Sequence, residues 1–350
     1  MITRFSLEET LRGARAATGV PGAAVGLSIA GEHSFVADGV LALGSSEPVR
    51  AETPFRIASV TKPFVATLCF EAGVLDDEVA AWLSHTAGLR CESAEPLPES
   101  CLGLWSYSNA GYWAAAARAV AAVGSPFEAA LQTLVLDPLE LSATGFDEPA
   151  DCARGHVQEG ETGHRAVLSD AYPVARRPSG GLWSTVGDLL RFGERHLDGY
   201  DELHRPRARA LGAEYALGWW VREGALDHEG SVAGYQSLLM LAPAKRLVLA
   251  LLTNSWRGSG LARRVVEGLD LVPPSRGGGR YEEGRYALDG ISATVRDGWV
   301  CEQETDPATG ARVERRYRPS FRATLMSHRS DFPREGVALI GWTALPRVEA

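Results

Sequence analysis

Lysine is almost absent from this chain of 350 residues. Of its 35 basic residues only Lys62 and Lys245 are lysines, and all the others are arginines. Arginine stays protonated in proteins, whereas a buried lysine can lose its proton and act as a base. Lys62 ends the segment Ser59-Val60-Thr61-Lys62, whose spacing places Ser59 and Lys62 on one face of a helix. The segment therefore favours a role that arginine cannot fill, an amine base beside a serine nucleophile.

The residues that flank this motif are mostly apolar. Phe55-Arg56-Ile57-Ala58 precedes Ser59, and the run Pro63-Phe64-Val65-Ala66-Thr67-Leu68 follows Lys62. Such surroundings disfavour the charged form of a lysine and lower its pKa. The alternative, a surface lysine on an ordinary helix, fits these neighbours less well.

Other features that the chain lacks exclude whole classes of protein. Its net charge is −9 and it has no basic run, so we expect no nucleic-acid partner. The five cysteines are scattered and form neither a disulfide framework nor a zinc pattern. Cys91 and Cys101 could pair, but buried free thiols are the favoured interpretation.

Long apolar segments are also missing. The run from Leu247 to Leu252 is too short to span a bilayer. The N-terminal residues carry early acidic side chains and lack the apolar centre of a signal peptide. We therefore expect a cytoplasmic protein with no membrane partner.

The composition, 45% apolar and 23% charged, is that of a globular protein with an ample core. Ser6 is the predicted N-cap of the first helix, with Glu9 completing a capping box. Gly31-Glu32 is predicted to join the first two strands as a hairpin. The predicted helices are 6–17, 59–72, 110–123, 127–136, 185–196 and 258–269, and the predicted strands are 23–30, 34–43, 215–221, 226–230, 234–241 and 246–253.

This order of elements places strands on both sides of a largely helical middle. We expect an α+β protein in which the terminal strands complete one central antiparallel sheet, with helices on both faces. Pro273-Pro274 and the glycines at 277–279 have the composition of a linker. The predicted organisation is a catalytic domain over 1–272, a linker over 273–280 and a small β domain over 281–350.

Two further segments carry chemistry-bearing side chains. Tyr107-Ser108-Asn109 precedes a predicted helix, where it is either an N-cap with a packing tyrosine or a proton-transfer and amide-binding pair. His228-Glu229-Gly230-Ser231 lies on a predicted strand, where His228 is either a core histidine or a residue that faces a cleft. Gly230 allows close approach of a ligand or of backbone. His85, in the turn Leu83–Leu89, reads as structural when taken alone.

Together, Ser59-x-x-Lys62, Tyr107-x-Asn109 and His228-x-Gly230 resemble the motifs of class C β-lactamases and penicillin-binding-protein-like serine enzymes. Other stretches are similar to the same family: 83–89, 179–185 with Asp188-Leu189, and 217–219. The resemblance covers about residues 5 to 270. The C-terminal part is similar to the lipocalin-like domain that some members append.

The resemblance implies an acyl-enzyme mechanism without a metal or a cofactor. Ser59 would attack an ester or amide carbonyl, Lys62 would take the serine proton, and Tyr107 would relay a proton to the leaving group. The backbone N–H groups of Ser59 and Ser231 would form the oxyanion hole, as in other acyl-transfer enzymes. Asn109, His228 and Gly230 would contact the substrate.

The chain departs from the family at three points, one of which is the missing export signal described above, and all three affect the expected substrate. The segment between Lys62 and Tyr107 is shorter than usual, and His228 replaces the lysine that is tied to binding a substrate carboxylate. We expect a small-molecule acyl donor and an amine or alcohol acceptor, or water, as in a transacylase, esterase or amidase. A D-alanyl-D-alanine carboxypeptidase, a β-lactamase and a non-catalytic binding protein on the same fold are the alternatives.

Overall fold

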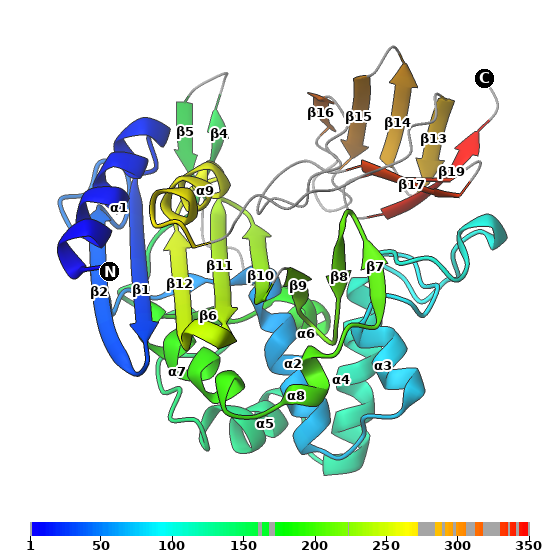
Figure 1. Cartoon of the computed structure of the whole chain (residues 1–350), viewed down its shortest axis with the longest axis horizontal. Helices are drawn as coiled ribbons and strands as arrows, with labels where there is room; N and C mark the ends of the chain where they lie inside the picture. The colour runs from blue at the N-terminus through cyan, green and yellow to red at the C-terminus, as the bar shows by residue number, and fades with distance from the viewer. Residues whose placement is uncertain are drawn as a thin grey trace.

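The structure is a computed structural model that describes residues 2–159, 163–167, 172–222, 224–271, 284–288, 291–296, 299–305, 312–317, 330–334, 337–340 and 343–348. Within these residues the chain forms two large antiparallel sheets (Figure 1). The first has the strand order β2-β1-β12-β11-β10-β9-β8-β7, and the second has the order β16-β15-β14-β13-β19-β18-β17.

The first sheet brings the two ends of the N-terminal 270 residues together. Its strands are β1 (Gly22–Ile29), β2 (Glu32–Gly39), β7 (Ala208–Ala210), β8 (Ala213–Tyr215), β9 (Trp220–Arg222), β10 (Ala225–Val232), β11 (Tyr235–Ala242) and β12 (Leu247–Thr253). Strand β1 pairs with β12, in the register Val25↔Leu251. The predicted central antiparallel sheet is therefore confirmed.

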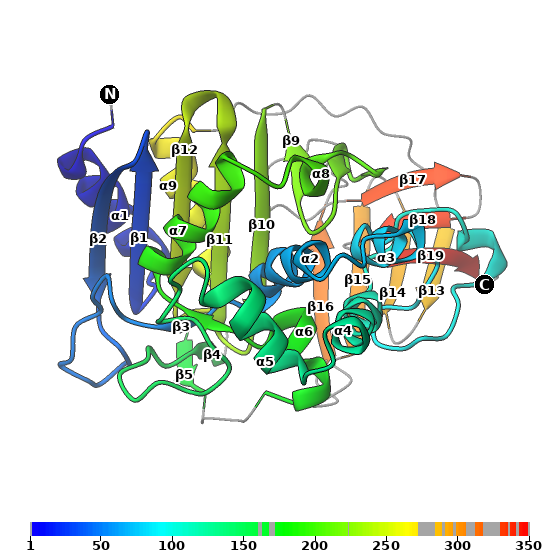
Figure 2. The same cartoon turned by 90° about the horizontal axis from the view of Figure 1, so that it is seen from below.

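Strand β12 shows why helices cover both faces of this sheet. All seven of its residues are buried, because successive side chains point to opposite faces and each face meets a core. Leu247, Leu249 and Leu251 pack with the helices α1 (Arg4–Thr18) and α9 (Gly258–Gly268). Val248, Ala250 and Leu252 belong to the larger core on the other face, with α7 (Val186–Leu197). Figure 2 shows α7 in front of the sheet, with α1 and α9 behind it.

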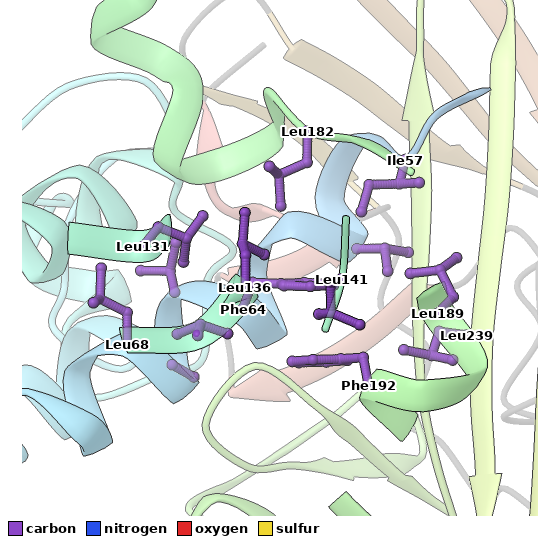
Figure 3. Close-up of a cluster of buried hydrophobic side chains, with 14 of the residues drawn as sticks. Ile57, Phe64, Leu68, Leu131, Leu136, Leu141, Leu182, Leu189, Phe192 and Leu239 are labelled. Carbon is purple, nitrogen blue, oxygen red and sulfur yellow. The ribbon is translucent and has the colours of Figure 1, made fainter. Parts of the chain in front are cut away.

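The middle of the chain forms the helical layer that carries the larger core. Its helices are η1 (Ala58–Val60), α2 (Thr61–Glu71), α3 (Asp77–Leu83), η2 (Glu99–Cys101), α4 (Asn109–Val123), α5 (Phe127–Leu131), η3 (Gln132–Leu136), η4 (Val174–Arg176), α6 (Arg177–Gly180) and α8 (Asp201–His204). In the core of Figure 3, Phe64 of α2 stacks on Phe192 of α7 with ring centroids 3.8 Å apart. This contact fixes the helix that follows Ser59 against the helix that covers the sheet.

The second sheet contains β13 (Gly284–Leu288), β14 (Ile291–Arg296), β15 (Trp299–Thr305), β16 (Arg312–Tyr317), β17 (Ser330–Arg334), β18 (Val337–Ile340) and β19 (Thr343–Val348). In Figure 1 it lies beside the β7–β8 hairpin. Ala344 of β19 is fully buried in a cluster with Trp105, Tyr215 and Trp220. The predicted small β domain is thus present as a sheet. The predicted linker lies outside the described residues, so the domain boundaries stay predictions.

Several predicted elements need correction. The first helix is capped by Thr3, whose side chain forms the capping box with Ser6, so the predicted box with Glu9 is wrong. The predicted strand 215–221 is two strands, β8 and β9, because Gly218 has φ +85° and makes a turn between them. The structure also has two short pairs that were not predicted, β3 (Phe55–Arg56) with β6 (Trp183–Ser184) and β4 (His156–Glu159) with β5 (Gly163–Ala166).

Two further predictions concern cysteines and membrane segments. All five cysteines are free, and Cys69, Cys101 and Cys152 are buried. Among the described residues, no single helix has the length and apolar character needed to cross a membrane. One bent pair, α4 with 127–136, meets both criteria jointly.

Candidate active site

Ser59 lies in a tight turn between strand β3 and helix α2. Ala58, directly before it, has φ +47°, a left-handed conformation that is rare for residues other than glycine and is found at functional sites. The Ser237 hydroxyl donates to the carbonyl of Ile57 at 2.7 Å and holds the turn to strand β11. Ser59 keeps partial solvent exposure while Val60, Thr61 and Lys62 are buried. The turn therefore exposes the Ser59 hydroxyl, while the residues on either side of it are buried.

Lys62 is fully buried, and all its polar contacts converge near Ser59. Its Nζ is 2.7 Å from the carbonyl oxygen of Ser179, 2.7 Å from Oδ1 of Asn109 and 3.4 Å from Oγ of Ser59. Burial lowers the pKa of Lys62 to about 7, against the opposing effects of Cys91 and Glu92. A large share of Lys62 is therefore a neutral amine near neutral pH.

The two short contacts determine where the lone pair of that amine points. The Ser179 carbonyl and the Asn109 amide oxygen are acceptors only, so each takes one N–H of the neutral amine. The third direction, toward Ser59 Oγ, is left for the lone pair. Lys62 is thus oriented to accept the Ser59 proton, which is the geometry of a general base.

Tyr107 is the second residue that contacts the Ser59 hydroxyl. Its hydroxyl donates to Ser59 Oγ at 2.9 Å, and its ring lies 4.7 Å from Lys62 Nζ. Burial raises the pKa of the Tyr107 phenol well above its usual value, so the phenol stays protonated. Tyr107 is therefore a proton donor in the resting site, and Lys62 is the group that can act as the base.

Asn109 is the first residue of α4, after the N-cap Ser108. Its Oδ1 accepts from Lys62, and its Nδ2 donates to a carboxylate oxygen of Glu92. The side chain was predicted to bind a substrate amide, and the structure places it between these two residues. The neighbouring Glu92 was not identified from the sequence, since the segment 84–98 that carries it has no helix or strand whose periodicity could place it.

Strand β10 brings the His228-x-Gly230 motif next to the turn that carries Ser59. A side chain on Gly230 would put a Cβ within 2.1 Å of the Ile57 carbonyl oxygen, so only glycine allows this approach. The strand continues to the exposed Ser231. Gly230 therefore has a backbone role, and its predicted contact with substrate stays a prediction, as does the oxyanion hole formed by Ser59 and Ser231.

His228 is almost fully buried and lies on strand β10, two residues before Gly230. Its Nδ1 contacts the Glu229 carbonyl at 2.7 Å and its Nε2 contacts the Tyr215 hydroxyl at 3.2 Å. Burial, with Lys62 nearby, lowers the pKa of His228 to about 3. His228 is therefore neutral, and both its ring nitrogens have protein partners. Its predicted contact with substrate stays a prediction.

His85 holds the segment that carries Tyr107 at three points. Its carbonyl accepts from the N–H of Ser106 at 2.9 Å, and its Nδ1 accepts from the N–H of Ser108 at 3.0 Å. Its ring centroid lies 4.3 Å from that of Tyr107. His85 itself has φ +61° and is 2% exposed. The turn that was interpreted as structural from the sequence therefore supports the segment that carries Tyr107.

Comparison with known proteins gives a consistent result. The family model described as Beta-lactamase matches residues 7–269. The chain is 25% identical over 311 residues to "Penicillin-binding protein 4" of Amycolatopsis lactamdurans, covering 67% of this chain and 81% of that protein. It is 28% identical over 228 residues to "Beta-lactamase" of Lysobacter lactamgenus, covering 51% of this chain and 56% of that protein.

Solved structures share the fold. SurE matches with a TM-score of 0.73 at 21% identity and covers 99% of each chain. A class C β-lactamase from Rhodobacter sphaeroides matches with a TM-score of 0.64 at 19% identity, covering 76% of this chain and 98% of its own. The likeness to SurE thus extends over the C-terminal sheet, whereas the likeness to the class C enzyme leaves about a quarter of this chain unmatched.

The fold and the serine–lysine–tyrosine site define the class of β-lactamase-fold serine hydrolases. The chain belongs to the β-lactamase family, because the family model covers most of its length. The predicted resemblance to this family is confirmed. The lipocalin-like character of the C-terminal sheet stays a prediction.

Proposed function

We propose that this protein transfers an acyl group from an ester or amide donor to an amine or alcohol acceptor, or to water, through an acyl-enzyme on Ser59. The observation that carries the proposal is the orientation of Lys62. Two acceptor-only oxygens hold its N–H groups at 2.7 Å and leave its lone pair for Ser59. A binding protein has no need of a buried amine with a pKa of about 7 in this position.

Acylation would follow from these contacts. Ser59 Oγ attacks the carbonyl carbon while its proton moves to Lys62 Nζ, and the carbonyl oxygen becomes an oxyanion. The tetrahedral intermediate then breaks the bond to the leaving group, which takes the phenolic proton of Tyr107, and the proton on Lys62 replaces it. The N–H groups of Ser59 and Ser231 would stabilise the oxyanion. Because the base is the neutral amine, acylation is expected to rise as pH rises through about 7.

The acyl-enzyme is then resolved by the reverse proton transfers. The acceptor attacks the ester carbonyl, and its proton moves to Tyr107 while Tyr107 passes its phenolic proton to Lys62. The bond between the carbonyl carbon and Ser59 Oγ then breaks, and Lys62 returns that proton to Ser59. Two features favour an ester or amide donor with an amine or alcohol acceptor over a β-lactam substrate. His228 is neutral and cannot supply the positive charge that pairs with a substrate carboxylate. SurE, whose fold matches along the whole chain, has also been solved with D-Leu, which makes D-leucyl esters sensible first donors.

The test is intact-mass spectrometry after incubation with activated esters, amides and benzylpenicillin, with D-leucyl and L-leucyl esters as a matched pair. A Ser59 adduct from an ester, followed by product formation on addition of an amine, supports the proposal. Hydrolysis alone with every acceptor would reduce it to an esterase. Efficient turnover of benzylpenicillin would favour the β-lactamase alternative, which is suggested by the descriptions of the two relatives named above.

A further inference from the structure

Glu92 lies near Lys62, the proposed base. The proposed mechanism gives its carboxylate no role. One of its oxygens accepts from Asn109 Nδ2, and the other accepts from Nη2 of Arg176 at 2.6 Å. Its side chain is 33% exposed and that of Arg176 is 34% exposed. Arg176 also lies against the ring of Trp113, with its guanidinium carbon 5.9 Å from the ring centroid. Glu92 is therefore held from both sides within the site.

The contact with Glu92 determines which way the Asn109 amide faces. A carboxylate only accepts hydrogen bonds, so the NH₂ end of the amide has to face Glu92. The carbonyl end, Oδ1, is then the end that meets Lys62. In the reverse orientation the amide oxygen would face the carboxylate and the NH₂ group would face the amine hydrogens. By holding the amide this way round, Glu92 keeps Asn109 Oδ1 in place as one of the two acceptors that orient the lone pair of Lys62.

Glu92 also acts on Lys62 through its charge. The other titratable groups around Lys62 are Cys91, His85, His228, Tyr107 and Tyr112, from four different parts of the fold. Burial disfavours charge on both histidines and on Tyr107 and Tyr112, and it raises the pKa of Cys91 to about 12. The Glu92 carboxylate favours the charged form of Lys62, and Arg176 offsets part of its effect.

We propose that Glu92, held by Arg176, is a positioning residue that fixes the Asn109 amide and the electrostatic environment of the catalytic lysine. The inference rests on the proposed function of Lys62 as the base. It assigns Glu92 no contact with the substrate.

The scarcity of lysine makes a direct test possible. Protein labelled with ¹³C and ¹⁵N only in lysine contains two labelled side chains, those of Lys62 and Lys245. Lys245 is exposed in the turn that follows the C-terminal end of strand β11, and it provides an internal reference. NMR titration of the side-chain signals follows the protonation of Lys62 whether or not a substrate is known.

Two substitutions should move that titration in opposite directions. Glu92→Gln removes the negative charge but keeps an acceptor for Asn109, so the midpoint for Lys62 should fall by roughly half a pH unit. Arg176→Gln removes the opposing positive charge, so the midpoint should rise by a smaller amount. Glu95→Gln changes an exposed carboxylate three residues along the same segment, which pairs with Arg90. It is the matched control and should leave the midpoint unchanged. In all variants the Lys245 signal should keep its wild-type midpoint.

A kinetic measurement adds an independent readout. The acid limb of the acylation rate, followed by adduct mass on Ser59, should shift with the NMR midpoint in each variant. Glu92→Ala, which also removes the acceptor for Asn109, should slow acylation at its optimum by about 10-fold. Glu92→Gln should keep most of the optimum rate.

The inference is overturned if Glu92→Gln leaves the Lys62 midpoint within 0.1 of the wild-type value, a limit of roughly the precision of such titrations. It is equally overturned if Arg176→Gln moves the midpoint in the same direction as Glu92→Gln, or if Glu95→Gln reproduces the shift. Failure of wild-type protein to form any Ser59 adduct would instead count against the proposed function, because the NMR result does not depend on acylation.

Discussion

The two halves of the site are held in different ways. Ser59 and Lys62 come from one continuous turn and helix whose buried residues pack into the larger core, as Phe64 does on Phe192 (Figure 3). Tyr107 and Asn109 lie where a loop meets the start of helix α4. Side-chain hydrogen bonds hold this junction to His85, to Glu92 and, through Ser106, to strand β19. The first half depends on apolar packing, which is redundant. The second depends on single hydrogen bonds, so individual substitutions should disturb it more selectively.

The largest expected effect lies in the first half. Ser59→Ala removes the nucleophile and should lower turnover on the order of 10⁶-fold, while the packed helix keeps its melting temperature. Ser100→Ala, at an exposed serine, is the control. Turnover and thermal unfolding of both variants test this, and an Ser59→Ala variant with several per cent of wild-type turnover would show that another group attacks the substrate.

Lys62→Arg comes next. Arginine keeps the charge but cannot give up a proton, so the loss should approach that of Lys62→Ala, about 10²- to 10⁴-fold. Lys245→Arg is the matched control, since it changes the only other lysine and should leave the rate unaltered. Near-normal acylation by Lys62→Arg would mean that a fixed cation is sufficient at this position and that Tyr107 has to be the base.

In the second half, His85→Leu removes the acceptor for the Ser108 N–H while keeping an apolar side chain. Misplacement of Tyr107 should slow acylation by ~10- to 100-fold. His85→Asn restores an acceptor and tolerates the left-handed backbone, so it should recover most of the rate. In a protein that already carries Tyr107→Phe, adding His85→Leu should lower the acylation rate only slightly further. A full additional loss there would argue against the role of His85 in holding Tyr107.

The smallest effect is expected from Ser106→Ala. This change leaves the buried N–H of Ala344 without its acceptor, at a cost of about 1–3 kcal/mol to the contact between β19 and the loop. Hydrogen exchange at Ala344 should speed up, and acylation should fall only a few-fold. If exchange at Ala344 is unchanged, the contact does not stabilise the loop, and the two halves of the site are more alike than we propose.

The same contrast explains what could be predicted from the sequence. The spacing of Ser59 and Lys62 fixes their relation on any helix, and the pattern of buried strands predicts the central sheet. Glu92 and the Ser179 carbonyl escaped prediction as partners of Lys62, because tertiary packing brings them there and no local periodicity marks them. Similarly, the strand predicted across Gly218 failed because its composition is strand-like while its backbone turns.

The hydrogen bond between Ser106 and Ala344 also has a kinetic consequence, since it joins residues 238 positions apart. Strands β1 and β12 of the central sheet pair across a similar separation, as in Ala23↔Thr253. Both contacts close a long loop, which slows folding. We therefore expect activity to return slowly during refolding, because the turn of Ser59 depends on the central sheet and the loop of Tyr107 depends on the contact with β19. A chain in which only the central sheet is complete would stay inactive until β19 docks beside this loop.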